Sequence, residues 1–181
     1  MQIQHDRFIR NWRKVGDSDV YPRYEKHIRP RFESEFRRFI GFATACELGE
    51  VTPVQCEIAY FNVIRPVPAV WESFHDMHRA TSTYGLPPVT NLPLIHDGSH
   101  LRQMFAILDD TGEFAGRLYT EVVPAIVDDT PAIRFNLTAR GHPRCDTVEA
   151  AMEFLDLGRR LIVKCFENAT TEGMHKSWMK E

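Results

Sequence analysis

Four separate stretches of the chain read as strands, and in two of them, 53–64 and 132–140, apolar side chains alternate with polar ones, a spacing typical of β-strands that bury one face. The last stretch alternates most regularly, with Ile133, Phe135 and Leu137 on one side and polar residues between them. Such half-buried strands leave their polar side chains in water. The sequence therefore predicts strands over 53–64, 101–108, 116–127 and 132–140.

Two short Asp-rich segments separate the last three of these strands. Asp109–Gly112 and Asp128–Pro131 contain the residues that favour tight turns. Strands joined in this way are expected to form an antiparallel meander. Residues 2–14 also alternate, but both parities carry large apolar side chains. We therefore expect a further strand there without assigning its buried face.

Two longer stretches, 24–43 and 148–169, have apolar residues at steps of three and four, as amphipathic helices do. Pro30 lies inside the first of them and has no amide hydrogen to donate, so it predicts either a kink or the true first turn of the helix. Asp146 and Glu149 form a capping-box-like start for the second helix.

Shorter helices are expected over 69–79 and 172–178, the last one anchored by Trp178, and a Pro- and Gly-rich loop over 81–100. Consecutive strands joined by tight turns, with helices gathered on one side, are typical of α+β proteins. A chain of 181 residues is the size of one domain. We therefore expect a single α+β domain, with a mainly antiparallel sheet of about five strands and two long helices packed on one side.

Charge and hydropathy exclude several classes of protein. Lys and Arg total 22 and Asp and Glu total 25, which gives a net charge of −3 and no general attraction for nucleic acid, although a local basic face remains open. No stretch has the roughly 18 to 20 apolar residues of a membrane span, and the first residues lack the apolar run of a secretory signal. We expect a cytoplasmic protein that does not enter a membrane.

Motifs that carry catalytic chemistry are missing from the sequence. The serines stand in no G-x-S-x-G elbow, the glycines form no phosphate-binding loop and the four cysteines form no C-x-x-C pair. The residues that come nearest to a metal-binding motif are four histidines, His75, His78, His96 and His100. Their spacing matches no standard metal motif, so we expect solvated side chains and assign no metal, cofactor or catalytic residue.

Arginines, amides and aromatic residues within the strands indicate a binding function instead. On one sheet face they would suit a protein partner, a nucleic-acid strand or a small anion. The alternative is a solvated face whose arginines pair with neighbouring carboxylates. The candidate binding residues are Arg7, Arg10, Trp12, Gln55, Glu57, Asn62, Arg134, Asn136 and Arg140.

Several motifs spread over the chain resemble a sporadically distributed bacterial family of uncharacterised proteins. They are Asp6–Phe8 with Asn11–Arg13 and Tyr21–Glu25, Gln55–Glu57 with Tyr60–Asn62, Leu137–Gly141, and Thr170–Glu172 with Met174, His175 and Trp178. The resemblance implies a fold but no activity. Members of that family have some tens of residues before the Asp-Arg-Phe motif, so we expect either an upstream start or a shortened form. In a shortened form, residues 2–13 would be an exposed edge strand, open to pairing with another chain.

The leading hypothesis is a non-enzymatic binding protein that contacts a protein partner through its first strand and its polar sheet face. The sporadic distribution of the family suggests a bacterial defence or toxin-neutralising system. One alternative is a binder of nucleic acid or a small anionic ligand on an arginine-bearing sheet face. The other is a histidine-dependent metal hydrolase. Self-association stays open as well.

Overall fold

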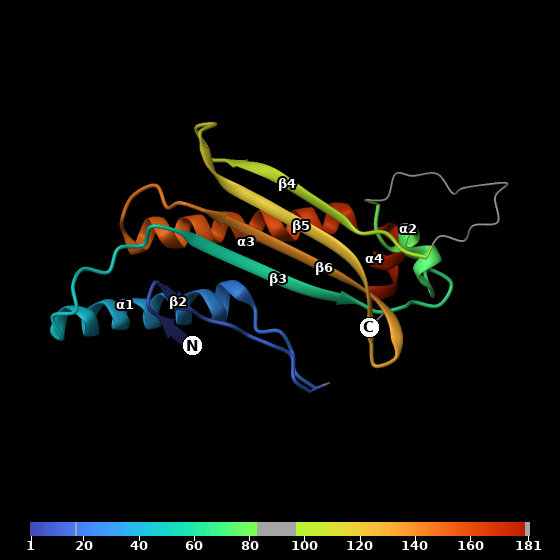
Figure 1. The fold of residues 1–181 in the computed structure, drawn as a ribbon, viewed down its shortest axis with the longest axis horizontal. Helices are drawn as coiled ribbons and strands as arrows, with labels where there is room; N and C mark the ends of the chain where they lie inside the picture. The colour runs from blue at the N-terminus through green and yellow to red at the C-terminus, as the bar shows by residue number, and fades with distance from the viewer. Residues whose placement is uncertain (17, 83–96, 180–181) are drawn as a thin grey trace.

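A four-stranded antiparallel sheet forms the centre of the molecule, which we describe from a computed structural model covering residues 1–16, 18–82 and 97–179. Its strands lie in the order β3–β6–β5–β4, with β3 Cys56–Ile64, β4 Leu101–Leu108, β5 Phe114–Val127 and β6 Thr130–Gly141 (Figure 1). This confirms the α+β class and the meander of the last three strands. The sheet has four strands rather than five, because the first stretch of the chain does not join it.

The N-terminal stretch forms a separate hairpin, with β1 Gln2–Gln4 paired to β2 Arg7–Ile9. One continuous strand over 2–14 was therefore a wrong prediction, because the chain turns back between the two short strands. The Phe8 ring packs on three phenylalanines of helix α1, Arg29–Ala45, with centroid distances of 5.2 to 5.6 Å. The hairpin is thus a cover for α1 and not an edge of the main sheet.

Both long helices begin with residues that are favoured in the first turn or at the N-cap of a helix. Tyr24–Ile28 forms a π-helical turn before α1, and Pro30 lies in the first turn of α1, so it starts the helix and does not kink it. Helix α3, Val148–Ala169, is capped by Thr147, whose hydroxyl accepts a hydrogen bond from the Ala150 amide. The cap is therefore one residue later than Asp146.

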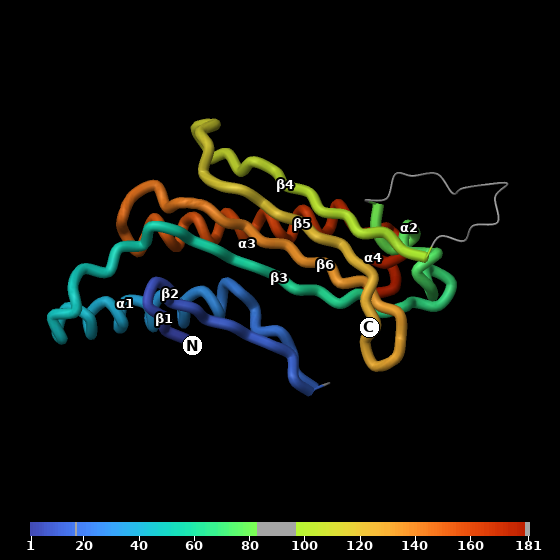
Figure 2. The backbone as a smooth tube through the Cα atoms, in the orientation of Figure 1, coloured from blue at the N-terminus to red at the C-terminus, as the bar shows by residue number. Residues whose placement is uncertain are grey.

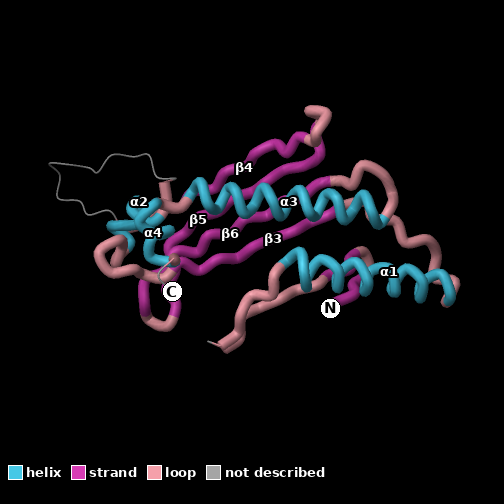
Figure 3. The backbone as a smooth tube through the Cα atoms, turned by 180° about the vertical axis from the view of Figure 1, so that it is seen from behind, coloured by secondary structure: helices cyan, strands magenta, loops and turns pink. Residues whose placement is uncertain are grey.

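Helix α3 covers one face of the sheet, and α1 packs beside it (Figures 2 and 3). The β6 side chains that face α3, among them Phe135 and Leu137, are fully buried. Gly158 allows the close approach, because a Cβ there would lie 2.9 Å from the Ala139 Cβ and from Ile58 Cγ2. The hydrophobic core thus lies on the α3 side of the sheet.

Two short helices close one end of this core. They are α2, Met77–Ala80, which follows a 3₁₀ turn at Phe74–Asp76, and α4, Glu172–Trp178. Trp178 stacks on Phe166 with ring centroids 5.7 Å apart, as an anchor would. The predicted loop falls mostly on residues 83–96, outside the described residues. In the part of the chain that the structure describes, no helix is long and apolar enough to cross a membrane.

Candidate functional site on the outer face of the sheet

The face of the sheet opposite α3, here called the outer face, is not covered by any described helix (Figure 1). Because side chains alternate along a strand, the pairing register assigns every second residue to this face. The register brings together Glu57, Ala59, Phe61 and Val63 of β3, Arg134, Asn136, Thr138 and Arg140 of β6, Arg117, Tyr119, Glu121 and Val123 of β5, and Arg102, Met104 and Ala106 of β4.

Both carboxylates of the outer face are engaged by neighbours on adjacent strands. Glu57 forms an ion pair with Arg140 directly across from it. Glu121 accepts a hydrogen bond of 3.0 Å from Asn136 Nδ2, and its other oxygen lies 3.4 Å from His100 Nε2. The Asn136 hydrogen bond, with His100 and Arg134 nearby, lowers the pKa of Glu121 below its usual range. Glu121 is therefore ionised at neutral pH, and both side chains are held in place by their neighbours.

Three arginines of the outer face have no carboxylate within ion-pair distance among the described residues. Arg102, Arg117 and Arg134 come from the adjacent strands β4, β5 and β6, and all three are exposed. The Arg117 guanidinium lies 5.1 Å from the Phe114 ring centroid, a cation–π contact that leaves its N–H donors available. The outer face thus presents three guanidinium groups that form no ion pair with any described residue.

Large apolar side chains lie among these arginines. Phe61 is 73% exposed, Met104 61% and Val63 51%. Val63 lies directly opposite Arg134 in the register, and Phe61 lies opposite Asn136. Exposed apolar groups interleaved with arginine are typical of surfaces that bind other proteins, where aromatic residues, Met and Arg are enriched.

Four of the nine candidate residues from the sequence share the outer face: Glu57, Arg134, Asn136 and Arg140. Asn62 points to the α3 side instead and donates a hydrogen bond of 3.1 Å to the Phe135 carbonyl. Its position has the opposite parity to Glu57, so one strand cannot present both residues on the same face. Gln55 is exposed but precedes β3 and takes no part in the pairing.

Arg7, Arg10 and Trp12 lie in the N-terminal hairpin and the segment after it, apart from the outer face. Arg10 pairs with Glu35 of α1, and the Trp12 ring packs edge-on against Tyr21 at 5.1 Å. The prediction that they join the β6 residues on one surface was wrong. The alternating pattern of residues 2–14 suits a hairpin as well as a strand, so it could not place them.

The exposed apolar residues Phe61, Val63 and Met104 were missing from the candidate residues. The sequence does contain a signal for two of them. Phe61 and Val63 are an even number of residues from Glu57, so their side chains lie on the same face of the strand as Glu57. For Met104, on β4, the face follows only from the pairing with Tyr119 on β5.

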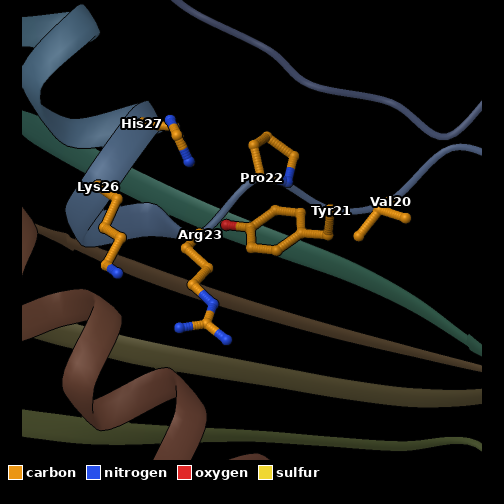
Figure 4. A pocket seen from close by; sticks show the side chains of 6 residues that line it. All are labelled: Val20, Tyr21, Pro22, Arg23, Lys26 and His27. Carbon is orange, nitrogen blue, oxygen red and sulfur yellow. The ribbon is translucent and has the colours of Figure 1, made fainter.

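A second basic surface lies beside the π-helical turn and is lined by Val20, Tyr21, Pro22, Arg23, Lys26 and His27. Figure 4 shows Arg23 and Lys26 extending to one side of the Tyr21 ring while His27 lies on the other side. The hollow is wide and shallow. Its cationic groups do not converge on one point, so it does not form a built anion site.

The histidines do not assemble a metal site among residues 1–16, 18–82 and 97–179, where no three His, Cys, Asp or Glu side chains come together. His78 Nδ1 lies 3.2 Å from the His75 carbonyl, His100 lies beside Glu121, and His96 is outside the described residues. Burial raises the pKa of the Cys56 thiol to about 11. That thiol is therefore protonated and a poor nucleophile at neutral pH.

Comparison with protein-family models, with curated proteins and with solved structures found no match to this chain. The resemblance to the bacterial family therefore stays a prediction.

Proposed function

We propose that the chain is a binding protein that recognises a protein partner through the outer face of its sheet. The partner's contacting surface carries carboxylates around apolar side chains. One observation carries this proposal. Among the described residues, an uncovered sheet face interleaves three arginines that lack carboxylate partners with the exposed side chains of Phe61, Val63 and Met104.

Charge and apolar area act together on such a face. Burying an exposed phenylalanine or methionine gains about 25 cal/mol for each Å² of apolar surface removed from water. Unpaired guanidinium groups donate charge-assisted hydrogen bonds to carboxylates, which fixes the orientation of the partner. The ladder of β3, β6, β5 and β4 already holds the side chains in place, so little backbone freedom is lost on binding.

A single-stranded nucleic acid or a small anion is the second candidate, favoured by the same arginines Arg102, Arg117 and Arg134. Two features rank it second. The carboxylates of Glu57 and Glu121 lie on the same face and repel phosphates. Stacking platforms for successive bases need several exposed rings side by side, whereas the exposed rings of Phe61 on β3 and of Phe114 beside Arg117 on β5 belong to strands that are separated by β6.

Site-specific photo-crosslinking in the host cell tests the proposal. A benzophenone amino acid is placed at Phe61, on the outer face, and in a matched variant at Arg160, an exposed α3 residue on the other side of the sheet. We expect one defined protein to be crosslinked from position 61 and not from position 160, and the Arg134→Glu substitution to abolish the product. Equal crosslinking from both positions, or a product that is insensitive to Arg134→Glu, contradicts the proposal.

Fluorescent single-stranded RNA and DNA test the second candidate. If the outer face binds nucleic acid, affinity falls steeply with salt and is lost in Arg134→Glu but not in Arg160→Glu. We expect no binding that depends on Arg134. The suggested role in a bacterial defence or toxin-neutralising system rests on the resemblance alone, and the identity of the crosslinked protein tests it.

A further inference from the structure

Among the described residues, strand β4 is paired along only one of its two edges. It pairs with β5 along one side, and no described residue pairs with its other side. The strand, Leu101–Leu108, contains neither Pro nor Gly, and Arg102 is its one charged residue. Natural proteins protect edge strands with prolines, inward-pointing charges or covering elements. The outer edge of β4 has none of these among the described residues, and the register irregularity between Ile107 and Leu108 lies at the end of the strand, which leaves residues 101–107 regular.

The opposite edge of the sheet differs. There the Tyr21 ring packs against Tyr60 of β3, with the two hydroxyls 2.7 Å apart, so the N-terminal segment lies beside that edge. Helix α3 packs mainly on β3, β6 and β5 and much less on β4. As a result Phe105, which points to the α3 side of the sheet, is still 45% exposed.

We infer that β4 pairs with β4 of a second copy of this chain, antiparallel and around a two-fold axis at Met104. In such a symmetric pairing the outer faces of both copies lie on the same side of the joined sheet. Two residues that lie opposite each other must then both have even numbers or both have odd numbers. With the axis at Met104, the opposed pairs are Met104 with Met104, Gln103 with Phe105, Arg102 with Ala106, and Leu101 with Ile107.

This register is compatible with the charges of the strand. Arg102 faces Ala106 of the second copy, so no like charges are opposed. On its own chain Arg102 lies opposite Glu121 of β5 in the register. The Phe105 rings of the two copies become diagonal neighbours across the axis and cover the apolar surface that α3 leaves exposed.

The consequence is one continuous sheet of eight strands, four from each copy, with both outer faces on the same side. A partner bound to this surface is bound bivalently. The pairing uses the backbone edge of β4, with Met104 of the outer face at the axis, and it requires no partner bound to that face, so it stands independently of the proposed function.

Sedimentation equilibrium of the purified chain tests the inference at about 100 µM, where dimers with micromolar dissociation constants are populated. We expect a mass of twice 21.0 kDa for the wild type. Met104→Lys and Met104→Glu place like charges opposite each other at the axis, so each variant alone is expected to be a monomer. Mixing the two variants restores a dimer, because Lys then faces Glu.

Phe61→Lys is the matched control, since it adds the same charge to the same face on the other edge strand. We expect it to remain a dimer. Circular dichroism and thermal unfolding of each variant verify the fold. A monomeric wild type, a Met104→Lys variant that stays dimeric, or a Phe61→Lys variant that dissociates each overturns the inference. The last of these results would indicate pairing through the outer faces instead.

Discussion

Two glycines within helices have opposite surroundings. Gly158 of α3 lies where a Cβ would approach Ala139 and Ile58 to 2.9 Å, whereas a Cβ at Gly41 of α1 has nothing within 4 Å. In a helix with room for the methyl group, Ala stabilises by about 1 kcal/mol relative to Gly. Where rigid neighbours fill the space, the added methyl group forces the helix and sheet apart.

Gly158→Ala is therefore expected to lower the free energy of unfolding by about 1–2 kcal/mol, and Gly41→Ala to raise it by about 0.5–1 kcal/mol. Urea unfolding of both variants measures the two changes. A stabilised Gly158→Ala variant would contradict the close packing of α3 on β6 and β3.

At the scale of elements, α1 is held to the rest of the molecule by ionic contacts. Arg37 of α1 pairs with Glu33 one turn earlier and with Glu149 at the start of α3. Arg29 and the Tyr24 hydroxyl both donate to Asp156. The hydrogen bonds from Arg37 are the main reason that the pKa values of Glu33 and Glu149 lie below their usual range.

These shifts give the docking of α1 a defined pH dependence. A carboxyl whose folded pKa is depressed stabilises the fold above its unfolded pKa, here 4.5, and that contribution is lost as the pH falls through the lower folded pKa. We expect Arg37→Gln to reduce the loss of stability below pH 4.5, because Glu33 and Glu149 then titrate closer to their unfolded value.

Urea unfolding between pH 7 and pH 3 makes the comparison. Arg38→Gln is the control, since Arg38 neighbours Arg37 on an exposed part of α1 and forms no ion pair with a described residue. If the free energy of unfolding depends on pH in the same way for Arg37→Gln and Arg38→Gln, the contacts of Arg37 do not lower the pKa values of Glu33 and Glu149.

The elements that the sequence predicted correctly are those with strong local signals. The strand over 101–108 matches β4 at both ends, because an Asp-rich turn follows it and a Gly- and Pro-rich segment precedes it. Residues 2–14 were predicted wrongly because alternation within each short strand of a hairpin resembles one longer strand. Strand order is non-local: that β3 pairs with β6 depends on packing against α3 and has no local signature.

The candidate site could be predicted only within single strands. Alternation places Arg134, Asn136 and Arg140 on one face of β6 without any structure. That Glu57 of β3 and Arg117 of β5 lie beside Arg140 requires the register between strands, which the sequence does not contain.

At the scale of the whole molecule, charge is unevenly distributed. Residues 1–38 contain ten basic and six acidic side chains, whereas residues 39–181 contain twelve and nineteen. The outer face belongs to the acidic part of the chain yet presents Arg102, Arg117 and Arg134 without carboxylate partners among the described residues. A local cationic surface on an anionic body selects partners by charge pattern and not by net charge.

The most direct measurement is the affinity of the protein crosslinked from position 61 for the wild type, Arg134→Glu and Arg160→Glu, by calorimetry at low and high salt. We expect Arg134→Glu to weaken binding about tenfold or more, with the difference smaller at high salt, and Arg160→Glu to bind like the wild type. Equal affinities of Arg134→Glu and Arg160→Glu would contradict recognition through the outer face.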